Sequence, residues 1–578
     1  MPKIPLLNFL RIAAGALALA ALVVFFLLGD VLGSQYYFGM LLIVPLGLAE
    51  ISLRARLEKQ KKIARARELW GKPIPKTRDF GEISLCYRSD GAGPGKIPID
   101  EKTCEDLNLH AFFAEADRTL TRPGEAMLYS MLRSPCCQDS RDELERRRQI
   151  ISLFETEDRL REEFQAVLVR VGVTRDNALT HLLWDKLPGK TAWAPLFDLA
   201  ALAALTALVL PFFLGPRLIL AIPLLFALNA AIHYKLKDRH AYLTTAIAQL
   251  TALLRTAGSL AGAKLPGLEA EQEMLRGPLK RVAKLLRKTR LLLTDFASGS
   301  DLYMLYEYLK VYFLVDIRGF YQTIEEIGAR ADDLRLVYRL LGNLDALQAV
   351  ASYRQNLAYT EPTLVPQGKF LQAVNIRHPL LKNPVPNSIE IGEKGILITG
   401  SNMAGKSTFL RTLGLNALLA QSIYTCLADR YTAGYLYPAT SINKMDDIGE
   451  NKSLYYAEAE RLRDIITPAY TLAPGLCLVD ELLAGTNYGE RLAASLAILN
   501  YLKGKNALTV VATHDLDLAD RLQGTYLCYH FSDSIDKNNL QFDYTLKPGI
   551  AATSNAIKLL EYLGYPGEIV REAQENLA

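Results

Sequence analysis

A glycine-rich loop that follows a short apolar run constrains the fold of this chain more than any other feature of its sequence. Residues 396–399 (ILIT) are apolar, and the next nine residues read GSNMAGKST. This matches the pattern G-x-x-x-x-G-K-[ST], in which glycines let backbone N–H groups curl around phosphates and the following helix points its positive end at them. We therefore expect a strand, a phosphate-binding loop and a helix, the first unit of an α/β P-loop domain.

The loop supplies the candidate nucleotide-binding residues. Lys406 can reach the β- and γ-phosphates of ATP, and the Ser407 hydroxyl can ligate Mg²⁺. The full candidate set is Gly400, Ser401, Asn402, Met403, Ala404, Gly405, Lys406, Ser407 and Thr408.

Two later apolar runs end in polar residues that suit ATP hydrolysis. Residues 476–479 precede Asp480, which is placed to give Mg²⁺ a second ligand, and Glu481, which is placed to polarise the attacking water. Residues 508–512 precede Thr513 and His514. A lone histidine is usually structural, but at this strand end His514 suits a γ-phosphate sensor. We expect Lys406, Glu481 and His514 to be catalytic, and Ser407 and Asp480 to hold Mg²⁺.

Four hydrophobic blocks occupy the first half of the chain: residues 11–28, 31–49, 196–214 and 218–232. Each approaches the ~20 residues that cross a bilayer, and short turns join them in pairs, so we expect two transmembrane hairpins. A cleaved signal peptide is the alternative for the first pair, although its apolar stretch exceeds the usual ~7–15 residues. The alternative for the second pair, which contains Pro223, is a helical hairpin buried in a water-soluble protein.

Basic residues lie at the outer ends of both predicted hairpins. The first is followed by a cluster of Arg54, Arg56, Lys59, Lys61, Lys62, Arg65, Arg67 and Lys72, and the second by Lys235, Lys237 and Arg239. The turns carry only Arg217. By the positive-inside rule, both hairpins start and end in the cytoplasm. We therefore predict a multi-pass protein of a bacterial inner membrane, with its ATPase facing the cytoplasm.

Charge and cysteine content limit the other possibilities. The net charge of +4 is accounted for by the basic cluster, so overall charge gives no argument for nucleic-acid binding. The seven cysteines form no C-x-x-C pair, which argues against zinc and a disulfide framework. A basic amphipathic stretch, 276–290, suits a solvated helix face, with DNA or anionic lipid as the alternatives.

The predicted domain order follows from these features. Residues 1–53 form the N-terminal transmembrane hairpin, and 54–100 a basic juxtamembrane segment and linker, of which 71–100 is a linker or a small β-rich patch. Residues 101–360 form a helical core that the second hairpin, 196–232, interrupts. Residues 361–578 form the P-loop ATPase domain.

The motifs together resemble the MutS family, whose ATPase is of the ABC type. The resembling segments are IRHP (376–379), PNSI (386–389), ILITGSNMAGKSTFLR (396–411), SLYYAE (453–458), VDELLAGTN (479–487), ATHDL (512–516), LKPG (546–549), TSNA (553–556), GYP (564–566) and, upstream, DRTLTRPG (117–124). The implied fold class is α plus α/β: transmembrane helical hairpins, an all-α MutS-like core and a C-terminal ABC-type ATPase domain.

The resemblance implies partners as well as fold. ABC-type sites are built from two chains, so we expect a homodimer in which Ser453 caps the γ-phosphate of ATP bound by the partner chain. By family position, Val385 and Tyr544 would lie against the adenine. Three residues depart from the family pattern after the Asp-Glu pair, where Leu482, Leu483 and Ala484 replace a more polar, glycine-containing run.

Two functions follow from the resemblance. The family's mismatch-reading domain and DNA clamp are not recognisable, and Phe80-x-Glu82, which has the wedge pattern, lies in too short a stretch for such a domain. The first hypothesis is an ATP-driven DNA-binding protein related to mismatch repair and tethered to the membrane. The alternative is a membrane-associated mechanoenzyme that acts on a protein or lipid client. A transporter is poorly supported, because the apolar segments offer little polar lining.

Overall fold

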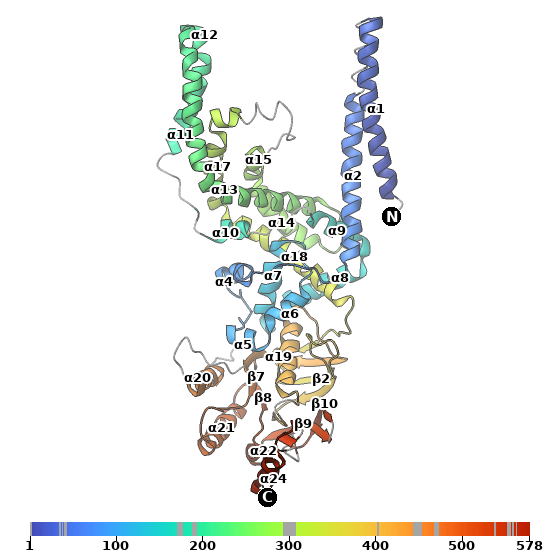
Figure 1. Cartoon of the computed structure of the whole chain (residues 1–578), viewed down its shortest axis with the longest axis vertical. Helices are drawn as coiled ribbons and strands as arrows, with labels where there is room; N and C mark the ends of the chain where they lie inside the picture. The colour runs from blue at the N-terminus through green and yellow to red at the C-terminus, as the bar shows by residue number, and fades with distance from the viewer. Residues whose placement is uncertain are drawn as a thin grey trace. The chain divides into compact units, whose positions relative to one another are not determined.

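The computed structural model describes most of the chain. The described residues are 3–33, 36, 39, 43–169, 177–185, 187, 194–292, 308–401, 404–442, 454–466, 473–536, 539–551, 557, 560–561 and 563–577. They divide into two compact units, whose helices and strands are labelled in Figure 1. Unit 1 comprises Met1–Ile74, Thr119–Gly124 and Leu153–Asp345, and unit 2 comprises Pro75–Arg118, Glu125–Ser152 and Ala346–Ala578.

Unit 1 is helical. Its helices are α1 (Lys3–Leu32), α2 (Ile43–Leu69), α9 (Asp158–Leu168), α10 (Ala178–Trp184), α11 (Ala194–Val209), α12 (Pro211–Leu214), η3 (Pro216–Leu220), α13 (Ala221–Gly262), α14 (Glu269–Arg281), α15 (Ala283–Leu292), α17 (Val315–Ala329) and most of α18 (Ala331–Arg354). Helix α1 packs along α2, and α9 contacts both α2 and α13. Helix α13 also contacts α10, α11, α14, α15 and α17, so it is the central helix of this unit.

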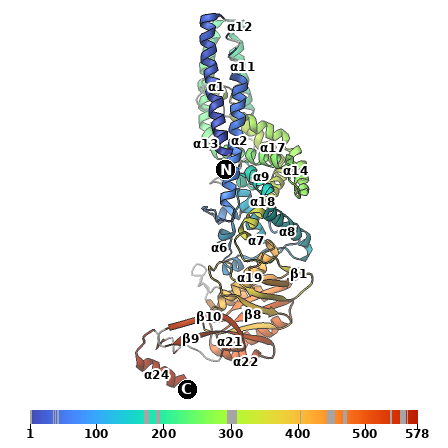
Figure 2. The same ribbon diagram turned by 90° about the vertical axis from the view of Figure 1, so that its right-hand side faces the viewer.

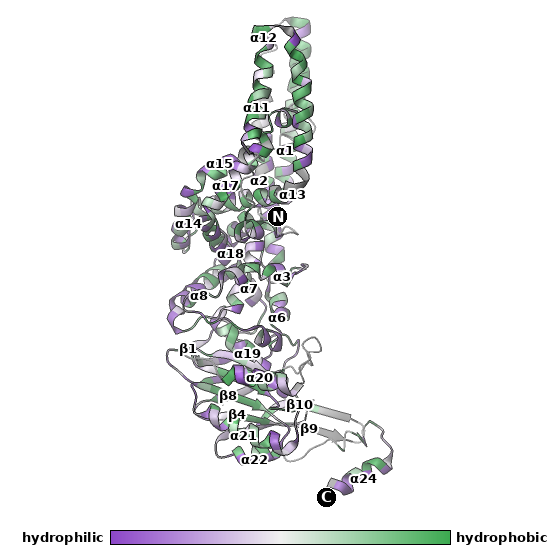
Figure 3. Ribbon diagram, turned by 90° about the vertical axis from the view of Figure 1, so that its left-hand side faces the viewer, coloured by the Kyte–Doolittle hydropathy of each residue, from purple (hydrophilic) through white to green (hydrophobic). Residues whose placement is uncertain are grey.

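Two helical segments in the described part of the chain are long and apolar enough to cross a membrane. They are Ile4–Leu32 and Arg217–Leu236, and Pro195–Val209 is a shorter apolar helix. Figure 3 shows these segments as largely hydrophobic. Only 6% and 11% of the two long segments is buried. The second predicted block, 31–49, lies partly outside the described residues, and α2 begins at Ile43.

The second hydrophobic pair differs from its predicted shape. Helix α11 ends at Val209 because Pro211 has no N–H to donate, and a new short helix starts at that proline. The fourth block is not a short helix, because α13 continues for 42 residues to Gly262. Pro223 is the third residue of α13, where its missing N–H would have no intrahelical partner, so it does not break the helix.

Polar contacts attach this apolar pair to the rest of unit 1. Asn229 of α13 is fully buried, and its side chain donates to the carbonyl of Tyr312 at 2.6 Å. The Tyr312 hydroxyl donates to the carbonyl of Ala204 in α11 at 3.1 Å. Arg318 of α17 pairs with Asp198 of α11 at 2.6 Å. The apolar helices are therefore held by α17 and the residues before it.

The N-terminal part of unit 2 is also helical. It contains α3 (Phe80–Ile83), α4 (Leu85–Asp90), α5 (Glu101–Asp106), α6 (Leu109–Ala116), most of α7 (Arg122–Arg133), η2 (Gln138–Ser140) and most of α8 (Arg141–Thr156). Residues 71–100, predicted as a linker or a β-rich patch, contain two short helices instead. Asp79 caps α3 by accepting from two of its backbone N–H groups. Phe80 stacks on His110 with ring centroids 4.0 Å apart, so it is a packing residue.

The C-terminal part of unit 2 contains two sheets. The strands are β1 (Thr363–Val365), β2 (Leu371–Ile376), β3 (Asn387–Ile391), β4 (Gly395–Thr399), β5 (Arg430–Gly434), β6 (Tyr437–Ser441), β7 (Gly475–Asp480), β8 (Ala507–Ala512), β9 (Tyr526–Asp536) and β10 (Asn539–Pro548). The larger sheet has the order β10-β9-β4-β8-β7-β6, and all its pairs are parallel except β9 with β10. The smaller sheet has the order β1-β5-β2-β3. Figure 2 shows β9 and β10 extending as a long ribbon.

Helices cover both faces of the larger sheet. They are α19 (Lys406–Ser422), α20 (Leu454–Ile466), α21 (Tyr488–Lys503) and α22 (Leu516–Leu522), and α24 (Gly567–Leu577) follows near the C-terminus. Ile396 and Ile398 of β4 pack toward α19, which also contacts the smaller sheet, whereas Leu397 packs toward α21 and α22. This alternation along a strand buries both faces and explains why the central strands are continuously apolar.

Candidate functional site

The predicted phosphate loop leaves the carboxyl end of β4 and leads into α19. Gly400 has φ +136° and Gly405 has φ +103°, a region that side chains with a Cβ rarely adopt. A Cβ on Gly400 would also lie 2.7 Å from the carbonyl oxygen of Phe531. Both glycines of the motif are therefore required by the backbone itself. Asn402 and Met403 lie outside the described residues.

The Lys406 side chain bonds back to the start of the loop. Its side chain is 2% exposed, and Nζ donates to the carbonyl oxygens of Gly400 at 2.6 Å and Ser401 at 2.8 Å. The ammonium group is thus held beside the first residues of the loop, at the N-terminus of α19. A cation at this point and the backbone N–H groups of the helix start form a site for an anion.

Ser407 and Asp480 meet at the carboxyl edge of the sheet. The Ser407 hydroxyl in the first turn of α19 donates a hydrogen bond to Oδ2 of Asp480 at the end of β7. In the sheet, β8 lies between β7, which carries Asp480, and β4, which leads into α19. The contact therefore joins the ends of two strands that are not neighbours. Hydroxyl and carboxylate oxygens are hard ligands of the kind that Mg²⁺ prefers, so the pair fits that ion.

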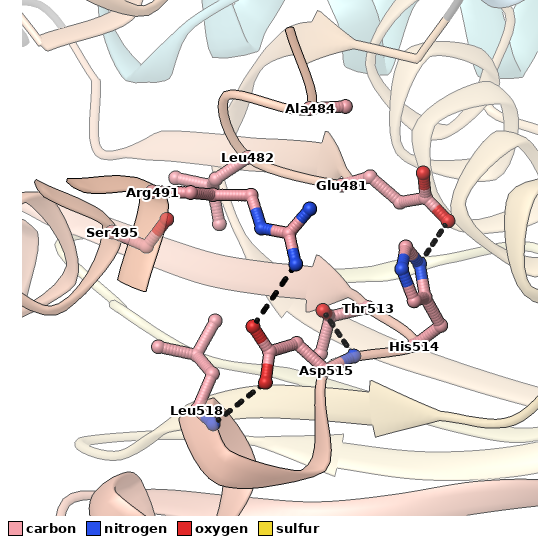
Figure 4. A pocket seen from close by; sticks show the side chains of 9 residues that line it. All are labelled: Glu481, Leu482, Ala484, Arg491, Ser495, Thr513, His514, Asp515 and Leu518. Atoms are coloured by element: carbon pink, nitrogen blue, oxygen red, sulfur yellow. Dashed lines mark hydrogen bonds and ion pairs between the residues drawn. The ribbon is translucent and has the colours of Figure 1, made fainter. Parts of the chain in front are cut away.

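Glu481 and His514 form a second pair at the same edge. His514 Nδ1 lies 2.8 Å from Glu481 Oε1, and because an ionised carboxylate only accepts, the imidazole donates. Glu481 has φ +54°, and its N–H donates to the carbonyl of Ala512 at 2.9 Å. The left-handed backbone turns the carboxylate toward His514, whose side chain is half exposed (Figure 4). A carboxylate beside an open histidine can take a proton from a bound water.

The comparisons with known proteins match the same region of the chain. Residues 396–578 match the family model of MutS domain V. The C-terminal region is therefore similar to MutS domain V. The chain is 34% identical over 241 residues to an endonuclease MutS2 of Streptococcus uberis, which covers 41% of this chain and 30% of the relative. It is 31% identical over 259 residues to the DNA mismatch repair protein MutS of Thermus thermophilus, which covers 44% of this chain and 31% of the relative. The chain thus spans about a third of the length of these curated relatives.

The departure from the MutS pattern after Glu481 has a structural explanation. Leu482 and Leu483 are each 4% exposed and pack in the cluster between the sheet and α21 and α22, with Leu492 and Val511. Leu483 has φ +52°, a conformation that glycine adopts more easily. Apolar packing therefore holds the backbone here in a left-handed conformation.

Residues beyond the motifs complete this corner of the candidate site. Arg491 of α21 lies 3.6 Å from Asp515, and Asp515 caps α22 by accepting from the N–H of Leu518 at 3.2 Å. The Asp515 N–H donates to Thr513 Oγ1 at 3.0 Å, which shapes the turn that carries His514 (Figure 4). Sequence reasoning missed Arg491 and Asp515. An aspartate three residues after the end of a predicted strand, before a helical run, is an N-cap signal that could have identified Asp515.

The two residues predicted to lie against adenine are close together. Asn387 Nδ2 donates to the carbonyl oxygens of Tyr544 at 3.0 Å and Val385 at 3.4 Å, and its Oδ1 accepts from the N–H of Leu546 at 2.7 Å. A Cβ on Gly405 would lie 3.2 Å from the Tyr544 ring, so this ring lies beside the phosphate loop. Val385 and Tyr544 are 40% and 44% exposed, which leaves apolar surface open to a ligand. Sequence reasoning missed the role of Asn387 as the residue that connects them.

Fewer contacts are described for the other predicted site residues. Ser453 lies outside the described residues, and α20 starts at Leu454 directly after it. Ala404 is fully buried, and Thr408 lies in the first turn of α19 and accepts a hydrogen bond at its carbonyl from Thr412. Nearby, burial lowers the pKa of His378 to about 4, and the positive charge of Arg411 in α19 adds to the effect.

Proposed function

We propose that this chain hydrolyses ATP with Mg²⁺ at the site formed by the loop 400–408 and the ends of β7 and β8. The observation that carries this proposal is the convergence of two pairs, Ser407 with Asp480 and Glu481 with His514, at one edge of the parallel sheet. The first pair fits a metal ion beside a phosphate-binding loop, and the second fits the activation of water.

Each residue has a distinct role in the proposed reaction. The loop N–H groups and Lys406 bind the phosphates. A water oxygen attacks the γ-phosphorus, the bond to the oxygen that bridges the β- and γ-phosphates breaks, and its electron pair leaves with ADP. Glu481 accepts the proton of the attacking water, and His514 orients Glu481 and contacts the γ-phosphate. Ser407 and Asp480 would hold Mg²⁺, which supplies charge neutralisation between the phosphates.

The adenine would lie on the exposed ring of Tyr544 with Val385 beside it. Aromatic rings stack on flat partners with a gain of about 0.5–1.5 kcal/mol beyond area burial. The pair of Tyr544 and Val385 supports ATP as the ligand, because the Tyr544 ring lies next to Gly405 of the phosphate loop.

We further propose that the chain works as a homodimer anchored in a membrane. The dimer follows from the relation to MutS, in which Ser453 would complete the partner's site. The anchor is supported by apolar helices whose side chains are largely exposed, among them Phe213, Leu220 and Leu224 at 80%, 77% and 71%. Contiguous apolar surface of this extent is unfavourable in water and stable in lipid. The ATPase would face the cytoplasm, on the side of the basic cluster.

Two kinds of molecule are compatible as the client on which the proposed ATPase acts. The names of the relatives, a mismatch repair protein and an endonuclease, favour DNA. The exposed apolar helices of unit 1 favour instead a protein or lipid client in the membrane.

The experiment that decides is ATP turnover by the detergent-purified full chain at fixed salt, without DNA and with homoduplex, mismatched or branched DNA. Stimulation by one DNA form that declines as salt is raised would support the DNA client. Turnover that is equal with and without every DNA would support the membrane client, and no turnover under any condition would refute the ATPase.

A further inference from the structure

Helix α5, at the start of the predicted helical core, contacts elements of the predicted ATPase domain within unit 2. Within unit 2 it packs against β6. Its last residue, Asp106, accepts a hydrogen bond at its carbonyl from Arg411 Nε of α19 at 2.8 Å. Its Thr103 hydroxyl accepts from Arg461 of α20 at 2.8 Å. One short helix thus touches three elements of the ATPase domain.

The Asp106 carboxylate fixes the end of β6. It is fully buried, and its Oδ2 accepts from the Thr440 hydroxyl at 2.8 Å and from the Ile442 N–H at 2.9 Å. Burial of a carboxylate is costly unless hydrogen bonds and charge compensate it, and Lys102 Nζ lies 4.0 Å from its other oxygen. This residue therefore holds a specific backbone position and does more than fill space.

The strand end that Asp106 holds lies next to the strand that carries Asp480. In the β6 and β7 register, Thr440 is opposite Leu478 and Ser441 is opposite Val479. Val479 directly precedes Asp480, so a displacement of β6 at Ser441 would reach the proposed Mg²⁺ ligand through one pair of strands.

Leu107, the residue after Asp106, packs between α19 and β7. Leu107 is fully buried, and a Cβ on Gly414 of α19 would lie 2.5 Å from Leu107 and 2.9 Å from Leu478 of β7. Leu107 therefore lies against α19, which carries Ser407, at the position of Gly414, where Leu478 of β7 is also close. The absence of a side chain at Gly414 is what lets these three elements approach.

Arg461 ties α20 to the same place. Its guanidinium donates to the carbonyl of Thr440 at 2.7 Å and lies 3.1 Å from Asp100, which caps α5. The end of β6 is thus held from both sides, by Asp106 of α5 and by Arg461 of α20.

From these contacts we propose that Asp106 is a positioning residue for ATP hydrolysis. Its carboxylate holds the end of β6 and its carbonyl bonds to α19, so that Ser407 and Asp480 keep the separation that Mg²⁺ requires. This inference rests on the proposed ATPase function.

The test compares Asp106→Ala with wild type in the full chain. We expect kcat to fall at least about tenfold and the half-saturating Mg²⁺ concentration to rise, because a misplacement of 1 Å can cost ~10²-fold in rate. The KM for ATP should change little, since Lys406 and Tyr544 keep their positions. Asp106→Asn retains an acceptor oxygen for Thr440 and Ile442, and it should restore most of the activity.

A matched control and a milder variant separate positioning from folding. Asp345 in unit 1 is also fully buried and accepts from the N–H and hydroxyl of Thr121, so Asp345→Ala should lower the melting temperature with kcat and the Mg²⁺ requirement unchanged. If Asp106→Ala does not fold, Thr440→Val removes one hydrogen bond and should shift the Mg²⁺ requirement in the same direction. Wild-type kcat and Mg²⁺ dependence in the folded variants would overturn the role of Asp106. A wild-type chain without turnover would instead refute the proposed function.

Discussion

At the scale of single residues, the proposed site depends on a strained backbone next to its central carboxylate. Glu481 and Leu483 both have positive φ, at +54° and +52°. Such conformations cost of order 1–3 kcal/mol for residues other than glycine and persist where the surroundings enforce them. Here the Glu481 N–H bond to Ala512 and the burial of Leu483 enforce them. The strain places the carboxylate against His514.

We predict that His514→Ala lowers kcat by about 10–100-fold, because Glu481 loses the group that orients it. The KM for ATP should change less than kcat, because the loop 400–408 and Lys406 still hold the phosphates. Steady-state kinetics of the full chain measure both constants. The matched control is His181→Ala, which breaks a similar pair with Asp185 at 2.7 Å in unit 1. Equal losses in the two variants would argue against a catalytic role.

His378 makes stability depend on pH. Its pKa is about 4 in the folded chain against an ordinary 6.5, so the folded state keeps it neutral. Above pH 6.5 neither state binds the proton, and as pH falls from 6.5 toward 4 only the unfolded state does. Stability is therefore lost in this window, by roughly 2 kcal/mol between pH 6.5 and 5.

Thermal unfolding of wild type and His378→Asn between pH 7 and 5 measures this contribution. Asparagine can still accept the hydrogen bond that Leu380 N–H gives to His378 Nδ1 at 3.1 Å, but it does not titrate. The variant should lose less of its melting temperature across this range. Parallel slopes would show that His378 is not the titrating group.

The residues of the site were predictable to different degrees. The loop 400–408, Asp480, Glu481 and His514 each end an apolar strand, and parallel strands bring such ends to one edge. Asn387 and Asp106 could not be found in this way, because their partners lie 157 and 334 positions away in the sequence. Long-range hydrogen bonds of this kind leave no local pattern.

At the scale of elements, the clearest unpredicted feature is how β3 and β10 are connected. Asn387 at the start of β3 bonds to the backbone of β10 at Tyr544 and Leu546. This bond determines where the Tyr544 ring lies relative to Gly405, and Tyr544 itself has a left-handed φ of +51°.

We predict that Asn387→Ala raises the KM for ATP by about 2–10-fold with kcat nearly unchanged, as expected for the loss of one stacking partner. Titration of the full chain with a fluorescent ATP analogue gives the same comparison without turnover. Asn375→Ala is the control, because Asn375 bonds to Asp429 on the surface at 2.7 Å. An unaltered affinity in Asn387→Ala would remove Val385 and Tyr544 from the nucleotide site.

The helices were predicted in kind but not in length. Hydropathy located the apolar segments, but the end of α11 before Pro211 was not predicted. The length of α13 was missed, because the apolar block 218–232 and the helical core after it were predicted as separate parts of the chain. Residues 233–262 contain no proline and no glycine before Gly258, so nothing in them stops the helix.

At the scale of the whole molecule, α13 links the apolar helices to the helical core without a break. At 1.5 Å per residue, its 42 residues extend about 63 Å, which is more than the ~30 Å of a bilayer core. Under the membrane proposal, the second half of this helix lies outside the lipid and packs against α10, α14 and α15. A movement of the core would then reach the membrane segment directly.

We predict that the full chain stays in the membrane fraction after washing with high salt and alkaline carbonate, and that detergent releases it. Leu224→Arg should weaken this association, since an arginine at a helix centre costs about 2.5–3.5 kcal/mol on insertion. Met274→Arg, at an exposed position of α14, should not. Release of the wild-type chain by salt or carbonate alone would contradict the membrane anchor.

ATP turnover by the purified full chain, compared between wild type, Glu481→Gln and Glu393→Gln, tests the central claim most directly. Glu393 is exposed in the turn before β4, at the opposite end of that strand from the phosphate loop. The account predicts that Glu481→Gln binds ATP as wild type does but hydrolyses it about 10²–10⁴-fold more slowly, whereas Glu393→Gln matches wild type. Equal turnover in all three proteins would show that the pair of Glu481 and His514 is not the centre of an ATPase.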